Sequence, residues 1–317
     1  MKTLITGASG FVGQALCAAL TAQQYDVIAT ARSDIHANGY KSLIVGHLDG
    51  QTDWSLALND VNVLVHLAAR VHVMNDTSAD PLAEFRKVNV EGTLNLARQA
   101  AKAGVKRFIF VSSVKVNGEQ TETGKPFNEN SDPAPQDAYG ISKLEAEQGL
   151  LNIAQETGME VVIIRPPLVY GAGVKANFAS MMRAVRRGIP LPLGAIHNKR
   201  SFVYVGNLVS IIICCIDHPA AANQVFMVSD GNDLSTTQLL RSCAEALGVK
   251  ARLLPVPQKM LELGAALIGK RNVAQRLCGN LQVDISKART MLGWTQLFSV
   301  ADGLKATALG LFNLDKK

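Results

Sequence analysis

The sequence predicts an α/β fold in which a doubly wound parallel sheet is joined to a smaller mixed α/β domain. In the first half of the chain, short runs rich in β-branched residues alternate with amphipathic helical stretches. The runs are apolar on both faces, as expected for strands of a parallel sheet covered by helices on both sides. A glycine-rich turn also stands between the first run and the first helical stretch.

The predicted strands of the first half follow one another with helical stretches between them. They are Lys2 to Thr6, Asp26 to Thr30, Val63 to His66, Arg107 to Ser112 and Glu160 to Arg165. The predicted helices include Gln14 to Ala22 and two longer stretches, Pro81 to Ala103 and Asp137 to Thr157. Because parallel strands need crossover connections, this alternation predicts a parallel sheet.

The pattern changes near Pro166, after which prolines interrupt the helical stretches and mark turns. We therefore predict a dinucleotide-binding domain over residues 1–165 and a substrate-binding domain over residues 166–317. Phe202 to Val205 and Gln224 to Val228 again resemble strands. They predict that the chain rejoins the sheet at about residues 201–228, so that the two domains interleave.

Composition excludes several classes of protein. With 317 residues, 48% hydrophobic and 18% charged, the chain can bury a sizeable core and is not disordered, collagen-like or a coiled coil. Its net charge of +6 comes from dispersed positive residues, so we expect no nucleic-acid partner. The five cysteines lack metal-ligand spacing, and no apolar segment has the length of a membrane span. We expect a cytoplasmic protein with reduced cysteines, no metal and no membrane partner.

The glycine-rich turn has the spacing of a phosphate-binding loop. Gly7, Gly10 and Gly13 stand three residues apart, directly between the first predicted strand and the first predicted helix. Glycines permit a tight turn and let backbone N–H groups approach a pyrophosphate, which the helix N-terminus also stabilises. In this position the motif predicts a Rossmann domain that binds a dinucleotide; the alternative is a glycine-rich turn without a ligand.

The end of the second predicted strand bears on the choice of dinucleotide. A carboxylate at this position would bind a free ribose 2′-hydroxyl, but the sequence has Arg32 and Ser33 instead. Both can donate hydrogen bonds to a 2′-phosphate. We therefore favour NADP(H), with NAD(H) possible; the alternative is that Arg32 is a solvated arginine that stacks on adenine.

Tyr139 and Lys143 stand four residues apart at the start of a predicted helix, so they share one helix face. An adjacent ammonium favours the phenolate, so we expect Lys143 to lower the pKa of Tyr139 and allow proton exchange with a substrate oxygen. Ser113, at the end of the fourth predicted strand, can hydrogen-bond the same oxygen. Taken alone, a tyrosine and a lysine at this spacing are more often a simple helix-surface pair.

The whole chain resembles the extended short-chain dehydrogenase/reductase family, of the NAD-dependent epimerase/dehydratase type that includes enzymes similar to UDP-glucose 4-epimerase. The motifs that carry this resemblance are TGASGFVG (6–13), HLAA (66–69), NVEGT (89–93), FVSS (110–113), YGISK (139–143), RPPLVYG (165–171) and RSFVYVGNLV (200–209). It implies that Ser113, Tyr139 and Lys143 are catalytic, that Lys143 also holds the nicotinamide ribose, and that Asn89 supports the site. The further cofactor-binding residues that it implies are Phe11, Val12, Leu48, Leu67, Ala68, Ala69 and Pro166.

The resemblance also implies a nucleotide-sugar pocket in the second half of the chain. Asn177, Leu191, Leu193 and Arg200 match positions that hold the nucleobase and the diphosphate. A guanidinium suits a diphosphate because it donates two parallel hydrogen bonds. The alternatives are a surface arginine and, for Asn177, a helix N-cap. In this family the two long predicted helices commonly form a homodimer face, which we expect here as well.

These observations predict an enzyme that transfers a hydride at C4 of a nucleotide-linked hexose or N-acetylhexosamine, with UDP the expected nucleotide. We favour a 4-ketoreductase, because Arg32 favours NADPH and a reductase consumes reduced cofactor. The alternative is a UDP-hexose or UDP-N-acetylhexosamine 4-epimerase, which regenerates its NAD. A non-catalytic NADP(H) sensor is less favoured, because it would not need the three catalytic residues.

Overall fold

The computed structural model describes residues 1–33, 39–71, 78, 80–267, 269 and 271–312. Seven strands form one sheet in the order β3-β2-β1-β4-β5-β6-β9, and every neighbouring pair is parallel. The strands are β1 (Lys2–Thr6), β2 (Asp26–Ala31), β3 (Lys41–Ile44), β4 (Val63–His66), β5 (Arg107–Val111), β6 (Glu160–Arg165) and β9 (Gln224–Met227). The predicted doubly wound α/β fold is confirmed.

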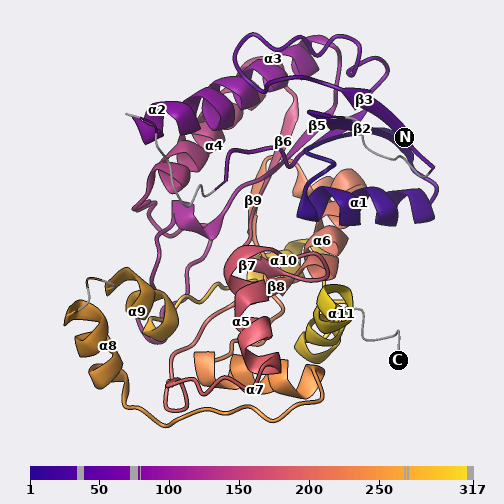
Figure 1. Cartoon of the computed structure of the whole chain (residues 1–317). Coiled ribbons are helices and arrows are strands. Elements are labelled where there is room, and N and C mark those ends of the chain that lie inside the picture. Colours follow the sequence, from indigo (N-terminus) through magenta and orange to yellow (C-terminus); the bar gives the residue numbers. More distant parts are fainter. Residues whose placement is uncertain (34–38, 72–77, 79, 268, 270, 313–317) are drawn as a thin grey trace.

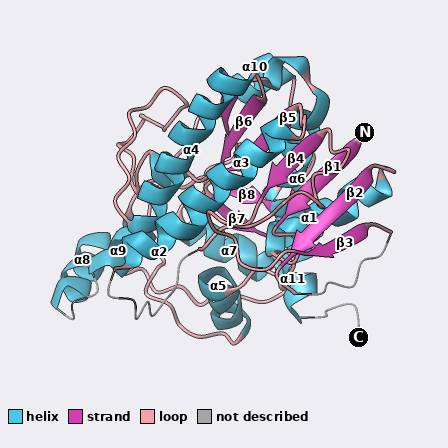
Figure 2. Cartoon of the chain, turned by 90° about the horizontal axis from the view of Figure 1, so that it is seen from above, coloured by secondary structure: helices cyan, strands magenta, loops and turns pink. Residues whose placement is uncertain are grey.

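Helices cover both faces of this sheet (Figures 1 and 2). On one face α1 (Phe11–Ala22) and α6 (Val205–Asp217) pack against the strands, and on the other face α3 (Thr93–Lys102) and α4 (Ala138–Thr157) do so. Successive residues of a strand point to opposite faces of the sheet. Ile5 therefore packs on the face covered by α1 and α6, and its neighbour Leu4 packs on the face covered by α3 and α4. Both are fully buried, which explains why the strands are apolar throughout.

The long helix predicted over Pro81 to Ala103 is divided into three parts. It consists of α2 (Pro81–Arg86), the π-helical segment η1 (Lys87–Gly92) and α3. A π-helical segment inside an α-helix is rare and frequently occurs at a functional site. This one carries Asn89, which the sequence assigns to the site.

The second half of the chain builds a smaller body around a separate apolar cluster. A two-stranded parallel sheet joins β7 (Leu168–Tyr170) and β8 (Phe202–Tyr204). The helices that follow β7 are α5 (Ala176–Arg186), α6, α7 (Thr236–Ala246), α8 (Gln258–Leu267), α9 (Arg271–Cys278), α10 (Ser286–Leu292) and α11 (Val300–Phe312). Side chains of α5, α7 and α11 pack together with Tyr170 and Phe202.

The chain returns to the large sheet through one of the two segments predicted to do so. β9 pairs with β6 at the edge of the sheet, as expected. The prediction for Phe202 to Val205 is wrong, because β8 pairs only with β7 and Phe202 packs with Tyr170 in the smaller cluster. A division into two domains at residue 165 stays a prediction.

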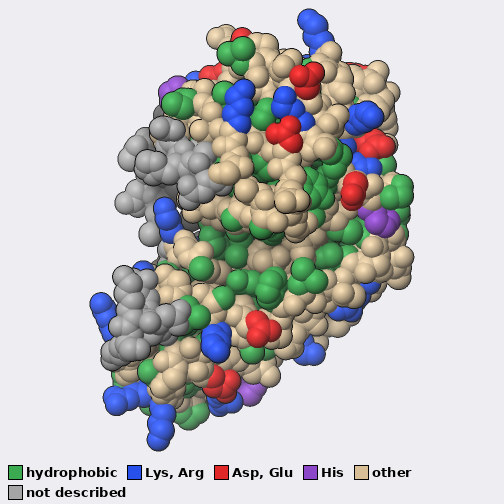
Figure 3. Space-filling model, turned by 90° about the vertical axis from the view of Figure 1, so that its right-hand side faces the viewer, with side chains coloured by type: hydrophobic (Ala, Val, Ile, Leu, Met, Phe, Trp, Pro, Cys, Tyr) green, Lys and Arg blue, Asp and Glu red, His purple; other side chains and the backbone are tan. Residues whose placement is uncertain are grey.

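The surface and the cysteines complete this description. On the face shown in Figure 3, hydrophobic side chains gather in a band across the middle, and charged side chains lie mainly above and below it. Within the described part of the chain, no helix has both the length and the apolar character needed to cross a bilayer. All five cysteines are free, and four of them are buried.

A buried ion pair fastens α4 to the sheet. Arg165, the last residue of β6, donates from Nε to Glu147 Oε1 at 3.0 Å and from Nη2 to Oε2 at 2.5 Å. The two side chains are only 7% and 3% exposed. Asn117 Oδ1 accepts a further bond from Arg165 at 3.2 Å. Glu145, two residues earlier on α4, instead pairs with Arg86 at the surface.

We expect Glu147→Ala to lower the free energy of unfolding by about 3–5 kcal/mol, because it leaves the Arg165 charge buried without its partner. Glu145→Ala is the matched control on the same helix. Its partner Arg86 is 47% exposed, so that loss should be much smaller. Urea denaturation of both variants measures the difference, and equal losses would contradict the assigned role of the buried pair.

Candidate active site

The parallel topology brings four predicted site segments to one edge of the sheet. β1, β4, β5 and β6 are consecutive neighbours and run in the same direction. The segments that follow them therefore lie side by side at the carboxyl edge. These are the glycine turn after β1, Leu67 to Ala69 after β4, Ser112 and Ser113 after β5, and Pro166 after β6.

The glycine turn forms a cradle that side chains would fill. Gly7 has φ +69°, and a Cβ there would lie 2.7 Å from the Ala68 nitrogen. A Cβ on Gly13 would lie 2.2 Å from the Gly7 oxygen, which already accepts a bond from Gly10 N at 2.9 Å. Gly10 is the N-cap of α1, and no side chain of the described residues caps it. The first-turn N–H groups at Phe11 and Val12 are thus placed to bind an anion, so the turn fits a dinucleotide pyrophosphate.

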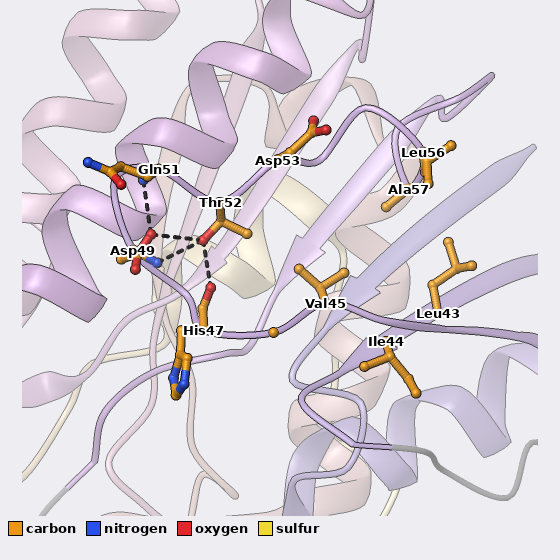
Figure 4. Close-up of a pocket in the computed structure, with 11 residues that line it drawn as sticks. Leu43, Ile44, Val45, His47, Asp49, Gln51, Thr52, Asp53, Leu56 and Ala57 are labelled. Carbon is orange, nitrogen blue, oxygen red and sulfur yellow. Dashed lines mark hydrogen bonds between the residues drawn. The ribbon is translucent and has the colours of Figure 1, made fainter.

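The predicted adenosine end lies at the carboxyl ends of β2 and β3. Arg32 and Ser33 directly follow β2 and are exposed, whereas Leu48 is half-buried and packs on the face of the sheet covered by α3 and α4. A pocket of about 470 Å³ adjoins this end (Figure 4). Its wall residue Val45 donates from its backbone to Ala31 O at 2.9 Å, beside Arg32. Ser113, Tyr139 and Lys143 do not line this pocket.

His66 positions the loop after β4 rather than serving as a base. It is fully buried, and its ring nitrogens lie 2.6 Å from Thr6 Oγ1 and 2.9 Å from Thr93 Oγ1. Burial, together with the charge of Lys143, lowers the pKa of His66 to about 3, so the ring is neutral. Thr6 also accepts bonds from the next residues, from Leu67 N and Ala68 N, at 3.3 Å each. The half-buried loop is therefore fixed against the glycine turn.

Lys143 is buried and reaches across to the end of β5. Its Nζ donates to Val111 O at 2.9 Å and lies 4.2 Å from the centroid of the Phe110 ring. Burial lowers the pKa of Lys143 to about 7, although Glu147 on the next turn of α4 opposes the shift. The side chain is thus a cation that is easily neutralised at the carboxyl edge of the sheet.

Tyr139 lies one helical turn from Lys143, half-buried against α2. Its ring is 6.1 Å from the Phe85 ring, and the Lys143 Nζ lies 6.0 Å from its centroid. Burial raises the pKa of Tyr139, and the negative charge of Asp137 raises it further. The prediction that Lys143 lowers the pKa of Tyr139 is therefore wrong for this structure, because the effect of burial on Tyr139 dominates and Lys143 itself loses its charge readily. The phenol is held in its protonated form.

Ser113 lies beside these residues because α4 begins against the turn that follows it. Ser113 caps the short 3₁₀ helix η2 (Val114–Val116), and its Oγ accepts from Lys115 N at 3.2 Å. Pro166 O accepts from Val114 N at 3.0 Å, so Pro166 adjoins the same turn. A Cβ on Gly140 would lie 2.9 Å from Lys115 O, which requires glycine after Tyr139. Ser113, Tyr139, Lys143 and Pro166 are thus brought together.

Asn89 links the loop after β4 to α4. Its Oδ1 accepts from Arg70 N at 2.8 Å, and its Nδ2 donates to Arg70 O at 3.0 Å and to Ser142 Oγ at 3.0 Å. Ser142 Oγ in turn donates to Tyr139 O at 2.8 Å. Asn89 is buried and positions the turn of α4 that carries Tyr139.

Sequence reasoning missed the charged group that surrounds the start of α4. Asp137 caps the helix by accepting from Gly140 N at 2.8 Å, and its other oxygen pairs with Lys115 Nζ. Lys115 also pairs with Glu119 at 2.9 Å. An aspartate just before a helix is a recognisable capping signal, but its ion pair with Lys115 spans 22 residues and has no local signature.

The predicted substrate residues lie in separate segments of the smaller body. Arg200 donates from Nη1 to Gly279 O at 3.1 Å. Burial lowers the pKa of Arg200; the nearby negative charge of Glu119 raises it, and the positive charge of Arg276 lowers it further. Leu191 and Leu193 pack against a small apolar cluster of α5 and α7, so a contact of their side chains with a nucleobase stays a prediction. Asn177 is not an N-cap, because α5 begins at Ala176 and Lys175 precedes it. Its side chain lies outside the described part of the structure.

The lowered pKa of Lys143 predicts a gain in stability when the charge is removed. We expect Lys143→Met to raise the free energy of unfolding by about 1–3 kcal/mol, even after the lost bond to Val111 O. The gain should be full below about pH 7 and disappear as the pH rises towards 10.5, the ordinary lysine value, where both states are neutral. Urea denaturation of the wild type and Lys143→Met across this pH range measures the gain in free energy of unfolding. Lys106→Met, at an exposed lysine, is the control. A pH-independent difference would contradict the assigned burial of charge.

Comparisons with known proteins agree with this architecture. Residues 3–229 match the NAD dependent epimerase/dehydratase family. A "UDP-glucose 4-epimerase" of Vibrio cholerae is 51% identical over 307 residues, covering 96% of this chain and 94% of that protein. Two solved structures from Bacillus cereus have the same fold. A UDP-N-acetylglucosamine 4-epimerase has a TM-score of 0.81 at 23% identity, covering 98% of this chain and 99% of that one. A UDP-glucuronic acid 4-epimerase in complex with NAD has a TM-score of 0.80 at 22% identity, covering both chains completely.

The family match covers more than half of the chain, and the Vibrio cholerae relative covers nearly all of it. The fold, the glycine cradle and the clustered Ser113, Tyr139 and Lys143 are consistent with an enzyme of this kind. The chain belongs to the NAD dependent epimerase/dehydratase family.

Proposed function

We propose that this protein is an NAD-dependent 4-epimerase of a UDP-linked hexose or N-acetylhexosamine. The observation that carries the proposal is the 51% identity, over nearly the whole length, to a protein named UDP-glucose 4-epimerase. The arrangement of Ser113, Tyr139 and Lys143 suits both an epimerase and a ketoreductase. The comparisons favour the epimerase over the 4-ketoreductase that Arg32 led us to prefer.

Tyr139, Ser113 and Lys143 have different roles in the proposed reaction at C4 of the sugar. In its phenolate form Tyr139 would take the proton of the C4 hydroxyl and later return it, while Ser113 hydrogen-bonds the same oxygen and fixes its position. Lys143 binds the nicotinamide ribose and stabilises negative charge on the Tyr139 oxygen. When bound, NAD supplies a hydride acceptor that can return the hydride to either face of the sugar. Arg200 is our candidate for the diphosphate, and Asn177 for the nucleotide end.

NAD replaces NADP(H) as the proposed cofactor. The preference for NADP(H) rested on Arg32 and Ser33. Both lie exposed at the end of β2, and no hydrogen bond to another described residue aims either side chain at a 2′-phosphate. An exposed arginine can equally stack on adenine. An epimerase oxidises and reduces within one turnover, so it has no need to select the reduced NADP pool. We also retain the homodimer through α2, α3 and α4 as a proposal.

We expect Tyr139→Phe to retain NAD but to lower turnover at least about 100-fold, because the ring still packs against Phe85 while the exchangeable proton is lost. Interconversion of UDP-glucose and UDP-galactose, and of the two N-acetylated counterparts, measures turnover without added cofactor. Tyr25→Phe, at the start of β2, is the control and should leave the rate unchanged. Full activity of the Tyr139 variant would exclude this mechanism.

The cofactor proposal has its own test. We expect NAD to be released when the purified protein is denatured, and Arg32→Ala to weaken NAD and NADP by similar factors of about two to ten. Calorimetric titration with each dinucleotide measures both affinities. Selective loss of NADP binding in that variant, with an empty site in the purified protein, would instead favour the ketoreductase.

A further inference from the structure

The helical hairpin of α8 and α9 is unlike the rest of the molecule. The two helices contact each other and extend away from the sheet, at the lower left in Figure 1 and at the left in Figure 2. No residue of α8 is buried among those described. Since α8 buries no side chain against the body, its apolar residues remain available to a partner.

Large apolar side chains are exposed on this hairpin. Met260 and Leu263 are each 64% exposed, Leu267 is 80% exposed, and Val273 on α9 is 50% exposed. Met260, Leu263 and Leu267 are spaced three and four residues apart, so they lie on one face of α8. A row of exposed side chains of this size marks an interaction surface rather than scattered surface apolar residues.

The hairpin and the residues that lead into it, 250–278, carry most of the net charge of the chain. Residues 250–278 contain Lys250, Arg252, Lys259, Lys270, Arg271 and Arg276 but a single acidic residue, Glu262. Six positive charges less one negative leave +5 of the total +6, so the other residues together contribute only +1. The expectation that the positive residues are dispersed is therefore wrong for the net charge, which is concentrated in residues 250–278. The cations of this segment that the structure describes are all exposed.

We propose that the α8–α9 hairpin docks on the surface of an anionic lipid bilayer. Apolar side chains on one helix face enter the headgroup boundary while flanking lysines and arginines pair with lipid phosphates. Within the hairpin itself, residues 258–278, four positive residues and one acidic residue leave a charge of +3. Two copies of the hairpin packed together would bring two such charges into contact, which opposes self-association. The hairpin would lie in the interface and would not cross the bilayer. This proposal replaces our expectation of no membrane partner, and it does not depend on the proposed activity.

The hairpin is fastened to the part of the chain that holds Arg200. At the end of α9, Leu277 O accepts from Thr236 Oγ1 at 2.5 Å and from Asn198 Nδ2 at 3.2 Å. Gly279 O accepts from Asn198 Nδ2 at 2.8 Å and from Arg200 Nη1 at 3.1 Å. Docking through the hairpin would therefore bring the Arg200 side of the molecule close to the lipid surface.

Sedimentation of the full chain with vesicles tests this proposal. We expect binding to vesicles that contain phosphatidylglycerol, little binding to pure phosphatidylcholine, and weaker binding as salt is raised. Leu263→Glu with Leu267→Glu should weaken binding at least about tenfold, and Lys259→Glu with Arg271→Glu should do the same. The matched controls are Ile44→Glu with Leu56→Glu, which changes exposed apolar residues near β3, and Lys41→Glu with Lys106→Glu.

Circular dichroism and size-exclusion chromatography with light scattering accompany each variant. Loss of binding in the hairpin variants only, with unchanged helix content and mass, supports the proposal. It is overturned if phosphatidylglycerol vesicles do not bind the wild type at low salt, or if control and hairpin variants lose binding equally. A change in oligomeric mass without vesicle binding would also overturn it, because the hairpin would then be an interface between copies.

Discussion

The site of this protein depends on the parallel alignment of β1, β4, β5 and β6. Because all four strands end at the same edge, four short segments that are far apart in the sequence become neighbours there. The helix α4 begins near this edge, packs against one face of the sheet, and is fixed by three contacts: Lys143 to Val111 O, Glu147 to Arg165, and Ser142 to Asn89. Each contact joins α4 to a different part of the sheet domain, so Tyr139 is held from several directions.

Burial governs the electrostatics of this edge. It lowers the pKa of His66 and Lys143 and raises that of Tyr139, so in each case the neutral form is favoured. Under our proposal, the anionic groups of a bound dinucleotide and sugar diphosphate would favour the Lys143 ammonium, and that charge would in turn favour the Tyr139 phenolate.

The second half of the chain uses its charged and apolar groups differently. In the sheet domain two strongly buried arginines are paired with carboxylates, Arg165 with Glu147 and Arg107 with Glu160. In the α8–α9 hairpin the cations that the structure describes are exposed, as are Met260, Leu263, Leu267 and Val273. Hydrogen bonds at the end of α9 connect this hairpin to Arg200, so the proposed lipid contact and the proposed diphosphate site share one side of the smaller body. A nucleotide-sugar enzyme of this form would work beside a bilayer without crossing it.

Local patterns in the sequence determined six of the seven strands of the large sheet, the glycine turn, and the Tyr139 and Lys143 pair. Apolar runs, glycine backbone conformations and four-residue helical spacing act over short distances and need no knowledge of the fold. Only the tertiary structure decided the features that depend on distant partners. β3 and β7 are short strands with exposed residues, and β8 was assigned to the wrong sheet because its partner is set by packing around Tyr170. The pKa of Tyr139 reversed its expected direction for the same reason, since burial and the Asp137 charge come from the assembled structure and not from the spacing.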